Sequence, residues 1–192
     1  MRDIKINRLW KAYPGVTVFQ DFSWSIPAEK CTCLMAPSGK GKTTLLRLLA
    51  GLEKPDSGML EIPADTRIAY VFQEDRLCPW LTVESNIRLV KPALSREEVH
   101  CALAAVGLEE AAERRAGELS GGMKRRTALV RALLSDWDLL ILDEPFTGLD
   151  EAMKGQTAAW AREKINGKTV LLVTHEEEDA AMLGAEIAKD IL

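Results

Sequence analysis

The sequence predicts an α/β fold with a mostly parallel central sheet, and three observations lead to this prediction. Short, nearly continuous apolar runs occur in "KCTCLMA", "LLILDEP" and "TVLLVT", as expected for central strands that are covered on both faces. Segments with helical apolar spacing alternate with these runs. A glycine-rich loop follows the first run and precedes a helix, which gives the strand, loop, helix order of a wound sheet.

In the first third of the chain the sequence pattern predicts mainly strands. In each segment apolar residues alternate with polar ones or form a short continuous run, and turn residues separate the segments. The predicted strands are residues 2–10, 16–26, 30–36, 58–62 and 67–73. Between the third and the fourth of these, residues 42–52 have the apolar spacing of a helix, and Gly51 marks its C-terminal end.

The middle of the chain, from about Leu77 to Leu119, has a helical pattern instead. Ser95 and Glu98 are spaced as a capping box at the start of a helix, and Gly107 is placed to end that helix. We therefore expect an inserted helical subdomain of about residues 77–119 within a single domain of 192 residues.

The last third returns to an alternation of strands and helices. The apolar runs of residues 139–145 and 169–174 predict two central strands. Such an alternation is typical of a wound, mostly parallel sheet. The predicted helices are Met123–Leu134, Glu151–Asn166 and Glu176–Leu183.

The composition excludes several classes of function. Lys and Arg number 25 against 29 Asp and Glu, and the net charge of −4 gives no sign of a chain that coats nucleic acid. Hydrophobic residues make up 47% of the chain, which argues against disorder and for a sizeable core. Because no apolar run approaches the roughly 20 residues of a membrane-spanning helix, a membrane role requires a partner.

The N-terminus and the cysteines predict a cytoplasmic protein. The segment "MRDIKINRLW" lacks the continuous apolar stretch of a secretion signal. Cys31, Cys33, Cys78 and Cys101 form no C-x-x-C pair, and with two histidines a zinc cluster has little support. We therefore expect reduced, structural thiols.

The loop "APSGKGKTT", residues 36–44, is the first candidate binding site. A glycine-rich loop at a helix start points main-chain N–H groups inward, where the helix dipole also favours an anion, so phosphate is the expected occupant. Gly39 and Gly41 permit a close approach of the main chain. Lys42 can extend its charge to the β- and γ-phosphates, and the Thr43 hydroxyl can bind Mg²⁺.

Ala36 stands where the pattern of a phosphate-binding loop has a glycine. If that position needs a left-handed backbone, alanine costs on the order of 1 kcal/mol, which weakens a site without abolishing it. Lys40 is expected to be a solvated charge. The alternative for the whole loop is a glycine-rich turn with an exposed pair of lysines.

Two further segments suggest phosphate chemistry. Asp143 and Glu144 end an apolar run before Pro145, at the edge where parallel sheets bind ligands, so they can hold Mg²⁺ and deprotonate a water. In "LSGGMKRR", Ser120 can cap a helix whose first N–H groups Gly121 and Gly122 leave uncovered, which gives a second anion site. The plain alternatives are an acidic pair at a helix start and an ordinary capped helix.

With these motifs the sequence resembles the ATP-binding subunits of ABC transporters over almost the whole chain. The motifs occur in the family's order: "APSGKGKTT" as Walker A, "VFQED" as the Q-loop, "LSGGM" as the signature, "LLILDEP" as Walker B, "TGLD" as the D-loop and "VTHE" as the H-loop. The resemblance implies a P-loop NTPase fold of the ABC type. It would have an N-terminal antiparallel β region, a nucleotide-binding core of residues 1–76 and 120–192, and the helical insertion.

The resemblance also implies a homodimer that closes head to tail. ATP and Mg²⁺ would lie between Walker A of one copy and the signature helix of the other. Glu144 would act as general base, with Gln73 on the attacking water. Lys42 and His175 would contact the γ-phosphate, although a single histidine at a strand end is also a common structural residue.

The remaining implied residues surround Mg²⁺ or the nucleotide. Thr43, Gln73 and Asp143 would bind the metal. Tyr13 matches the aromatic residue that stacks on adenine, with Trp10 as a substitute and a half-buried strand aromatic as the plain alternative. The residues implied to bind nucleotide are Tyr13, Pro37, Ser38, Gly39, Lys40, Gly41, Lys42, Thr43, Thr44, Ser120, Gly121, Gly122 and Asp150.

Two features depart from the family's pattern. Met123 stands where the signature motif usually has glutamine, and it removes an amide that can hydrogen-bond near the nucleotide, so we expect slower hydrolysis or a weaker closed dimer. The chain ends soon after the H-loop, so we expect no regulatory domain and a less protected sheet edge.

The segment "EDRLCPWLTVESNI" points to the partner. Leu77, Pro79, Trp80 and Leu81 fall in a predicted loop, where they line a groove for a partner's helix or pack the base of the helical subdomain. By resemblance this region meets transmembrane permease subunits on the cytoplasmic face of the membrane. The sequence of this segment is most similar to that of importers of nitrate, sulfonate, taurine or thiamine precursors, which also use a solute-binding protein.

Two other classes of function stay open on the sequence alone. One is an ATP-driven clamp without a membrane partner, whose members generally carry a coiled-coil insertion or two tandem cassettes; this chain has neither. The other is a scaffold that binds ATP but scarcely hydrolyses it, as Ala36 and Met123 suggest. Steady phosphate release that is lost in Glu144→Gln would exclude the scaffold.

Overall fold

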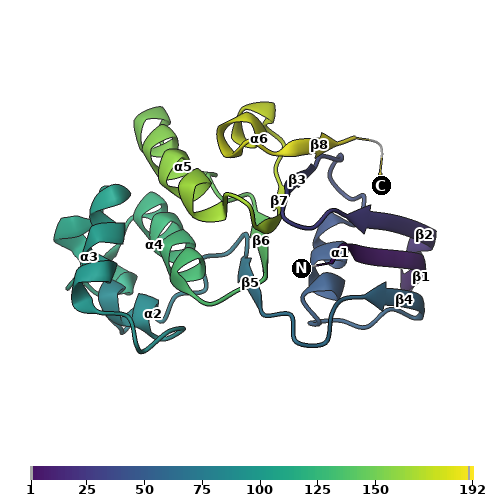
Figure 1. The fold of residues 1–192 in the computed structure, drawn as a ribbon, viewed down its shortest axis with the longest axis horizontal. Helices are drawn as coiled ribbons and strands as arrows, with labels where there is room; N and C mark the ends of the chain where they lie inside the picture. The colour runs from purple at the N-terminus through teal and green to yellow at the C-terminus, as the bar shows by residue number, and fades with distance from the viewer. Residues whose placement is uncertain (1, 190) are drawn as a thin grey trace.

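The computed structural model describes residues 2–189 and 191–192, and in this part of the chain the strands form two sheets. The larger sheet is parallel, with the strand order β5-β6-β7-β3-β8. Figure 1 shows it in the middle of the molecule, between the smaller sheet at one end and helices α2 and α3 at the other. Its strands are β3 (Cys31–Leu34), β5 (Ile68–Val71), β6 (Leu139–Asp143), β7 (Thr169–Val173) and β8 (Glu186–Ala188).

The smaller sheet is antiparallel, with the order β2-β1-β4, and it confirms the expected N-terminal antiparallel region. Its strands are β1 (Ile4–Tyr13), β2 (Val16–Ile26) and β4 (Ser57–Glu61). Gly15, with φ of 81°, turns the chain between β1 and β2. Because Tyr13 and Val16 are paired at this turn, the hairpin presents both side chains at its tip.

The helices begin and end close to where the sequence places them. The capping box is confirmed, because the Ser95 side chain accepts from the N–H of Glu98 and the Glu98 carboxylate accepts from the N–H of Ser95. One helix begins at Gly121 rather than at Met123, since Ser120 caps it. The helices are α1 (Lys42–Leu49), α2 (Val83–Arg88), α3 (Arg96–Ala105), α4 (Gly121–Leu134), α5 (Glu151–Ile165) and α6 (Glu177–Leu183), with short 3₁₀ turns η1 (Glu109–Ala111) and η2 (Ala116–Glu118).

The larger sheet is buried on both faces. Leu139 and Ile141 of β6 pack on one side with α1 and the antiparallel sheet. Leu140 and Leu142 pack on the other side with α2, α3, α4 and α5. Since successive side chains of a strand point to opposite faces, this confirms that the apolar run of residues 139–143 is a central strand. In the described residues, no helix has both the length and the apolar character needed to cross a bilayer.

Candidate functional site

A pocket of about 540 Å³ opens where the parallel strands end. Side chains from separate segments meet in it: the β1–β2 hairpin, the loop before α1, and the segments that follow β5, β6 and β7. Apart from Val16 and Val18, every lining residue is one that the sequence assigns to nucleotide, metal or catalysis. The lining residues are Tyr13, Val16, Val18, Ser38, Gly39, Gly41, Lys42, Thr43, Thr44, Gln73, Asp143, Glu144 and His175.

The loop between β3 and α1 depends on its glycines. Gly39 and Gly41 have φ of 82° and 88°, a left-handed conformation that side chains with a Cβ rarely adopt. A Cβ at Gly41 would also lie 2.5 Å from Cγ1 of Val18 and 3.0 Å from the ring of Phe19. Any larger residue at Gly41 would therefore push the loop away from β2 and open the pocket.

The expectation that alanine at position 36 strains the backbone is wrong. Ala36 does not have a positive φ, and the alanine therefore carries no left-handed penalty. The described non-glycine residues that do have a positive φ are Arg8, Asp21, Glu29, Arg76 and Glu144.

Lys42 bridges the same loop from its first helical turn. Its Nζ donates to the carbonyl oxygen of Ala36 at 2.5 Å and to that of Pro37 at 3.1 Å. Burial lowers the pKa of Lys42, while the carboxylates of Glu144 and Asp143 act in the opposite direction. Because its present partners are neutral carbonyls, an incoming phosphate would give the ammonium a stronger, charge-assisted hydrogen bond.

Asp143 and Glu144 differ in setting although they are neighbours. Asp143 ends β6, is buried, and lies 3.5 Å from the hydroxyl of Tyr70; burial raises its pKa. Glu144 has φ of 52°, and its N–H donates to the carbonyl oxygen of Val173 at 2.9 Å. A left-handed non-glycine residue is strained by about 1–3 kcal/mol, and such strain is concentrated at functional sites.

The Glu144 carboxylate lies within reach of a histidine. Its Oε1 is 3.2 Å from Nε2 of His175, and its Oε2 accepts from the hydroxyl of Thr147 at 3.4 Å. Burial raises the pKa of Glu144, and the nearby imidazole acts in the opposite direction. A carboxylate with a raised pKa is better suited to take a proton from water than an ordinary surface glutamate.

The oxygen atoms at the inner end of the pocket suit Mg²⁺. The Thr43 hydroxyl, the Gln73 amide and the Asp143 carboxylate all line it. Among the described residues, no group of three or more His, Cys, Asp or Glu side chains could hold a metal on its own. Mg²⁺ is typically bound by one or two carboxylates together with substrate phosphates and water, so the donor set fits this ion.

Tyr13 lines the outer end of the pocket. Its hydroxyl donates to the carboxylate of Glu53, and Nζ of Lys11 lies 5.2 Å from the centre of its ring. Trp10, the substitute considered from the sequence, instead lines a separate hollow on the antiparallel sheet together with Met59. The structure therefore places Tyr13, and not Trp10, where a flat ring could stack in this pocket.

The signature and D-loop residues lie outside this pocket. The Ser120 side chain caps α4 by accepting from the N–H of Met123 at 3.4 Å, and Asp150 caps α5 in the same way. A Cβ at Gly122 would lie 3.3 Å from the carbonyl oxygen of Gly148, so the two segments touch. The implied nucleotide-binding residues that do not line the pocket are Pro37, Lys40, Ser120, Gly121, Gly122 and Asp150.

A buried lysine that the sequence did not single out fixes the segment around His175. Nζ of Lys154, on α5, lies 2.7 Å from Oδ1 of Asp179 and also donates to the carboxylate of Glu176. The hydroxyl of Thr174 donates to the other oxygen of Asp179 at 2.8 Å. Burial opposes the charge of Lys154, but its hydrogen bonds to the two carboxylates raise its pKa overall.

Lys154→Met is expected to lower the free energy of unfolding by about 3–5 kcal/mol, because it leaves the buried carboxylate of Asp179 without its cation. Urea denaturation measures the loss. Lys164→Met is the matched control on the exposed side of the same helix and should cost less than about 1 kcal/mol. A loss in Lys154→Met no larger than that of the control would contradict the ion-pair account.

Comparisons with known sequences agree with the geometry of the pocket. The family model described as "ABC transporter" matches residues 19–147. An aliphatic sulfonates import ATP-binding protein (SsuB 2) of Agrobacterium fabrum is 39% identical over 192 residues, covering 96% of this chain and 74% of the relative. A sulfate/thiosulfate import ATP-binding protein (CysA) of Synechocystis is 38% identical and is covered over 57% of its length.

Solved structures have the same fold. The dimeric structure of MJ0796, described as a bacterial ABC transporter cassette, has a TM-score of 0.81 and 28% identity, covering 93% of this chain and 90% of that chain. A second dimeric MJ0796 structure, in a post-hydrolysis state with ADP and phosphate, also has a TM-score of 0.81, with 26% identity and the same coverage.

Proposed function

This chain belongs to the ABC transporter family, and from that premise we propose that it drives the import of a small organic or inorganic anion. It is an ATP-binding and ATP-hydrolysing subunit that uses Mg²⁺. One observation carries the assignment of the site: residues from separate motifs, among them Lys42, Gln73, Glu144 and His175, line a single pocket. The cargo class rests on relatives whose names specify sulfonates or sulfate.

We propose the following roles for the residues that line the pocket. The loop of residues 36–44 and Lys42 bind the triphosphate. Mg²⁺ held by Thr43, Gln73 and Asp143 would neutralise charge on the phosphate oxygens. Glu144 takes a proton from a water whose oxygen attacks the γ-phosphorus, while the bond from that phosphorus to the ADP oxygen breaks, which gives ADP and phosphate.

His175 has a positioning role in this proposal. Its Nε2 is 3.2 Å from the carboxylate of Glu144, so it can orient that carboxylate and contact the γ-phosphate from the same position. Lys154 holds Glu176 directly, and it holds Thr174 through Asp179, so both neighbours of His175 are fixed. Loss of the His175–Glu144 contact, or of the Lys154 contacts that fix the neighbours of His175, is therefore expected to disturb hydrolysis more than ATP binding.

A second copy of the subunit completes the site. Ser120, Gly121, Gly122 and Asp150 lie outside the pocket of their own chain, and Ser120, Gly121 and Asp150 are exposed. We propose that these residues contact ATP held by the partner copy, an arrangement that the dimeric MJ0796 structures support. The main-chain N–H groups at the start of α4 would bind the γ-phosphate there.

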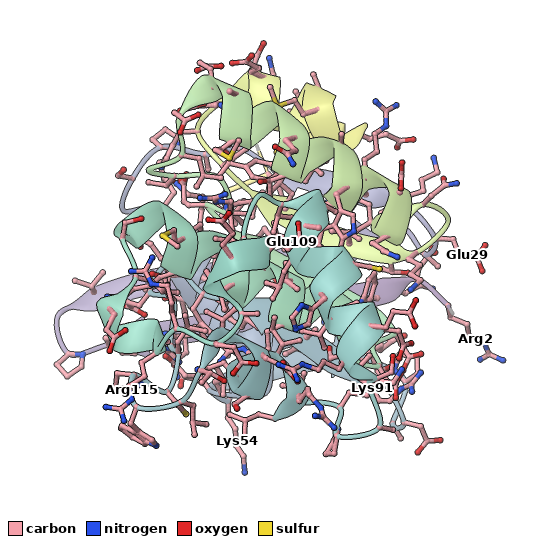
Figure 2. All side chains as sticks on the ribbon, turned by 90° about the vertical axis from the view of Figure 1, so that its left-hand side faces the viewer. Arg2, Glu29, Lys54, Lys91, Glu109 and Arg115 are labelled. Atoms are coloured by element: carbon pink, nitrogen blue, oxygen red, sulfur yellow. The ribbon has the colours of Figure 1, made fainter. Side chains whose placement is uncertain are left out.

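Residues 77–119 are proposed to form the subdomain that meets the permease, on the cytoplasmic face of the membrane. Figure 2 looks at this end of the molecule, where Glu109 and Arg115 are labelled and both side chains are exposed. Trp80 is 70% exposed, whereas Leu77 and Leu81 are partly buried. Of these three side chains, Trp80 is therefore the one best placed to contact a partner's helix.

Trp80→Asp is expected to reduce recovery of the permease subunits in co-purification by about tenfold or more, because an aromatic side chain that the permease would bury is replaced by a charge. The fold should be unchanged, since the side chain is exposed. Met59→Asp is the matched control: Met59 is 60% exposed but lies on the antiparallel sheet. Normal assembly of Trp80→Asp would remove this residue from the proposed interface.

The import proposal is tested with the assembled transporter. Vesicles that contain the permease and this subunit should accumulate a sulfonate or sulfate only when Mg²⁺ and ATP are present on the subunit's side. Backbone strain at Ala36 no longer supports the alternative of a poorly hydrolysing scaffold, because Ala36 does not have a positive φ. Uptake that is independent of ATP, or ATP turnover with no uptake of any such anion, would refute the proposed cargo.

A further inference from the structure

Arg125 is a buried cation that the proposed chemistry does not use. It lies on α4, five residues after Ser120, and is 5% exposed. A buried guanidinium is costly unless its N–H groups are paired. Its partners here lie in the loop of residues 72–76, which carries Gln73.

The contact has the geometry of a clamp. Nη1 of Arg125 donates to the carbonyl oxygen of Phe72 at 2.6 Å, and Nη2 donates to that of Gln73 at 2.5 Å. These two carbonyls belong to the peptide groups on either side of the Cα of Gln73. Because peptide groups are planar, holding both of them fixes the backbone of Gln73 and the direction of its Cα–Cβ bond. Asp75 lies 3.5 Å from Nη1 and pairs with the same charge.

Little else holds Gln73. In residues 2–189 and 191–192, no main-chain to main-chain hydrogen bond involves residues 73–76. A second arginine of α4, Arg131, donates to the carbonyl oxygens of Arg76 at 3.0 Å and Asp75 at 3.3 Å. Arg131 therefore anchors the far end of the loop, whereas Arg125 acts on Gln73 itself.

We propose that Arg125 is a positioning residue: by clamping the two peptide groups beside Gln73, it keeps the Gln73 amide directed into the Mg²⁺ and phosphate end of the pocket. The inference rests on the proposed function of that pocket. It also joins the two ATP sites physically, because Ser120, which is proposed to meet the ATP of the partner copy, caps the start of α4. A shift of α4 would move Gln73 with it.

The test compares Arg125→Met with Arg131→Met, a matched change on the same helix and against the same loop. Arg125→Met should lower kcat for ATP by about tenfold to a hundredfold, as expected when a reacting geometry is misplaced by about 1 Å, and should leave KM within about twofold. Arg131→Met should leave kcat within about twofold of the wild type. Arg125→Lys, which keeps a cation near both carbonyls, should recover part of the loss.

NMR ¹⁵N relaxation without nucleotide gives a readout that does not depend on activity. The order parameters of the N–H groups of Gln73 and Glu74, which belong to the two clamped peptide planes, should be lower in Arg125→Met than in either the wild type or Arg131→Met. In a Gln73→Ala background, Arg125→Met should lower kcat no further, because a residue that acts through Gln73 has nothing left to position. Arg125→Lys serves in the same cycle if Arg125→Met does not fold.

Three results would overturn the proposal: unchanged kcat in folded Arg125→Met, an equal loss in Arg131→Met, or losses that add in the Gln73→Ala background. Unchanged order parameters of Gln73 and Glu74 would do the same, because the clamp would then hold nothing. A wild-type chain without ATP turnover would refute the proposed function instead, and the order parameters would still decide whether the clamp exists.

Discussion

Lys42→Ala should weaken binding of Mg²⁺·ATP by about a hundredfold or more. Lys42 is the one lysine or arginine among the described side chains that line the pocket, and its loss removes charge-assisted hydrogen bonds worth about 1.5–3 kcal/mol each. Calorimetric titration with ATP in the presence of Mg²⁺ measures the change in Kd.

Lys40→Ala is the matched control for this experiment. Lys40 belongs to the same loop, is exposed and does not line the pocket, and the substitution keeps its main-chain N–H. Its Kd should stay within about threefold of the wild type, as is usual for a surface charge. Equal affinity in Lys42→Ala and the wild type would mean that the triphosphate does not bind at this loop.

Glu144→Gln should abolish most ATP turnover and leave ATP binding intact. The amide has the same shape but cannot accept the proton of the attacking water, so kcat should fall by about a hundredfold to ten-thousandfold. Single-turnover phosphate release measures the chemical step, and titration with ATP shows whether binding survives.

A nearby exposed glutamate supplies the control. Glu177, two residues after His175, forms a surface ion pair with Lys189, and Glu177→Gln should change kcat by less than about threefold. Unchanged phosphate release in Glu144→Gln would remove this residue as the general base. Loss of ATP binding in the same variant would show instead that its carboxylate holds the nucleotide.

The sequence predicts most of this site because the topology brings the relevant positions together. Asp143 ends one parallel strand, His175 follows the neighbouring strand, and the loop before Lys42 follows the next strand in the sheet. The carboxyl ends of parallel strands share one edge, so motifs far apart in the chain must meet there. Local apolar runs are enough to locate those strands.

Contacts between distant side chains could not be predicted in this way. Lys154 pairs with residues more than twenty positions away, and Arg125 with carbonyls more than fifty positions away. Neither contact has a period or a motif, because each depends on where a helix comes to lie against a segment far away in the chain. Val16 and Val18 were missed for the same reason, since only the closing of the hairpin onto the loop of Gly41 brings them to the pocket.

Backbone conformation at individual residues could not be predicted from the sequence either. The strain expected at Ala36 depended on a dihedral angle that residue type does not determine, and it is absent. The strained residue of the site is instead Glu144, whose left-handed φ occurs directly after the last residue of β6. Glutamate has no intrinsic preference for that conformation, so only the structure reveals it.

The central claim is that one chain supplies two parts of a shared site, and the mass of Glu144→Gln in solution tests it most directly. Light scattering with saturating Mg²⁺·ATP should give twice the 21.3 kDa of one chain. Adding Gly121→Glu should return the mass to that of one chain. A Cβ there meets nothing within 4 Å, but its carboxylate would repel the partner's phosphate. A single-chain mass for ATP-saturated Glu144→Gln, or a dimer that survives Gly121→Glu, would contradict the account.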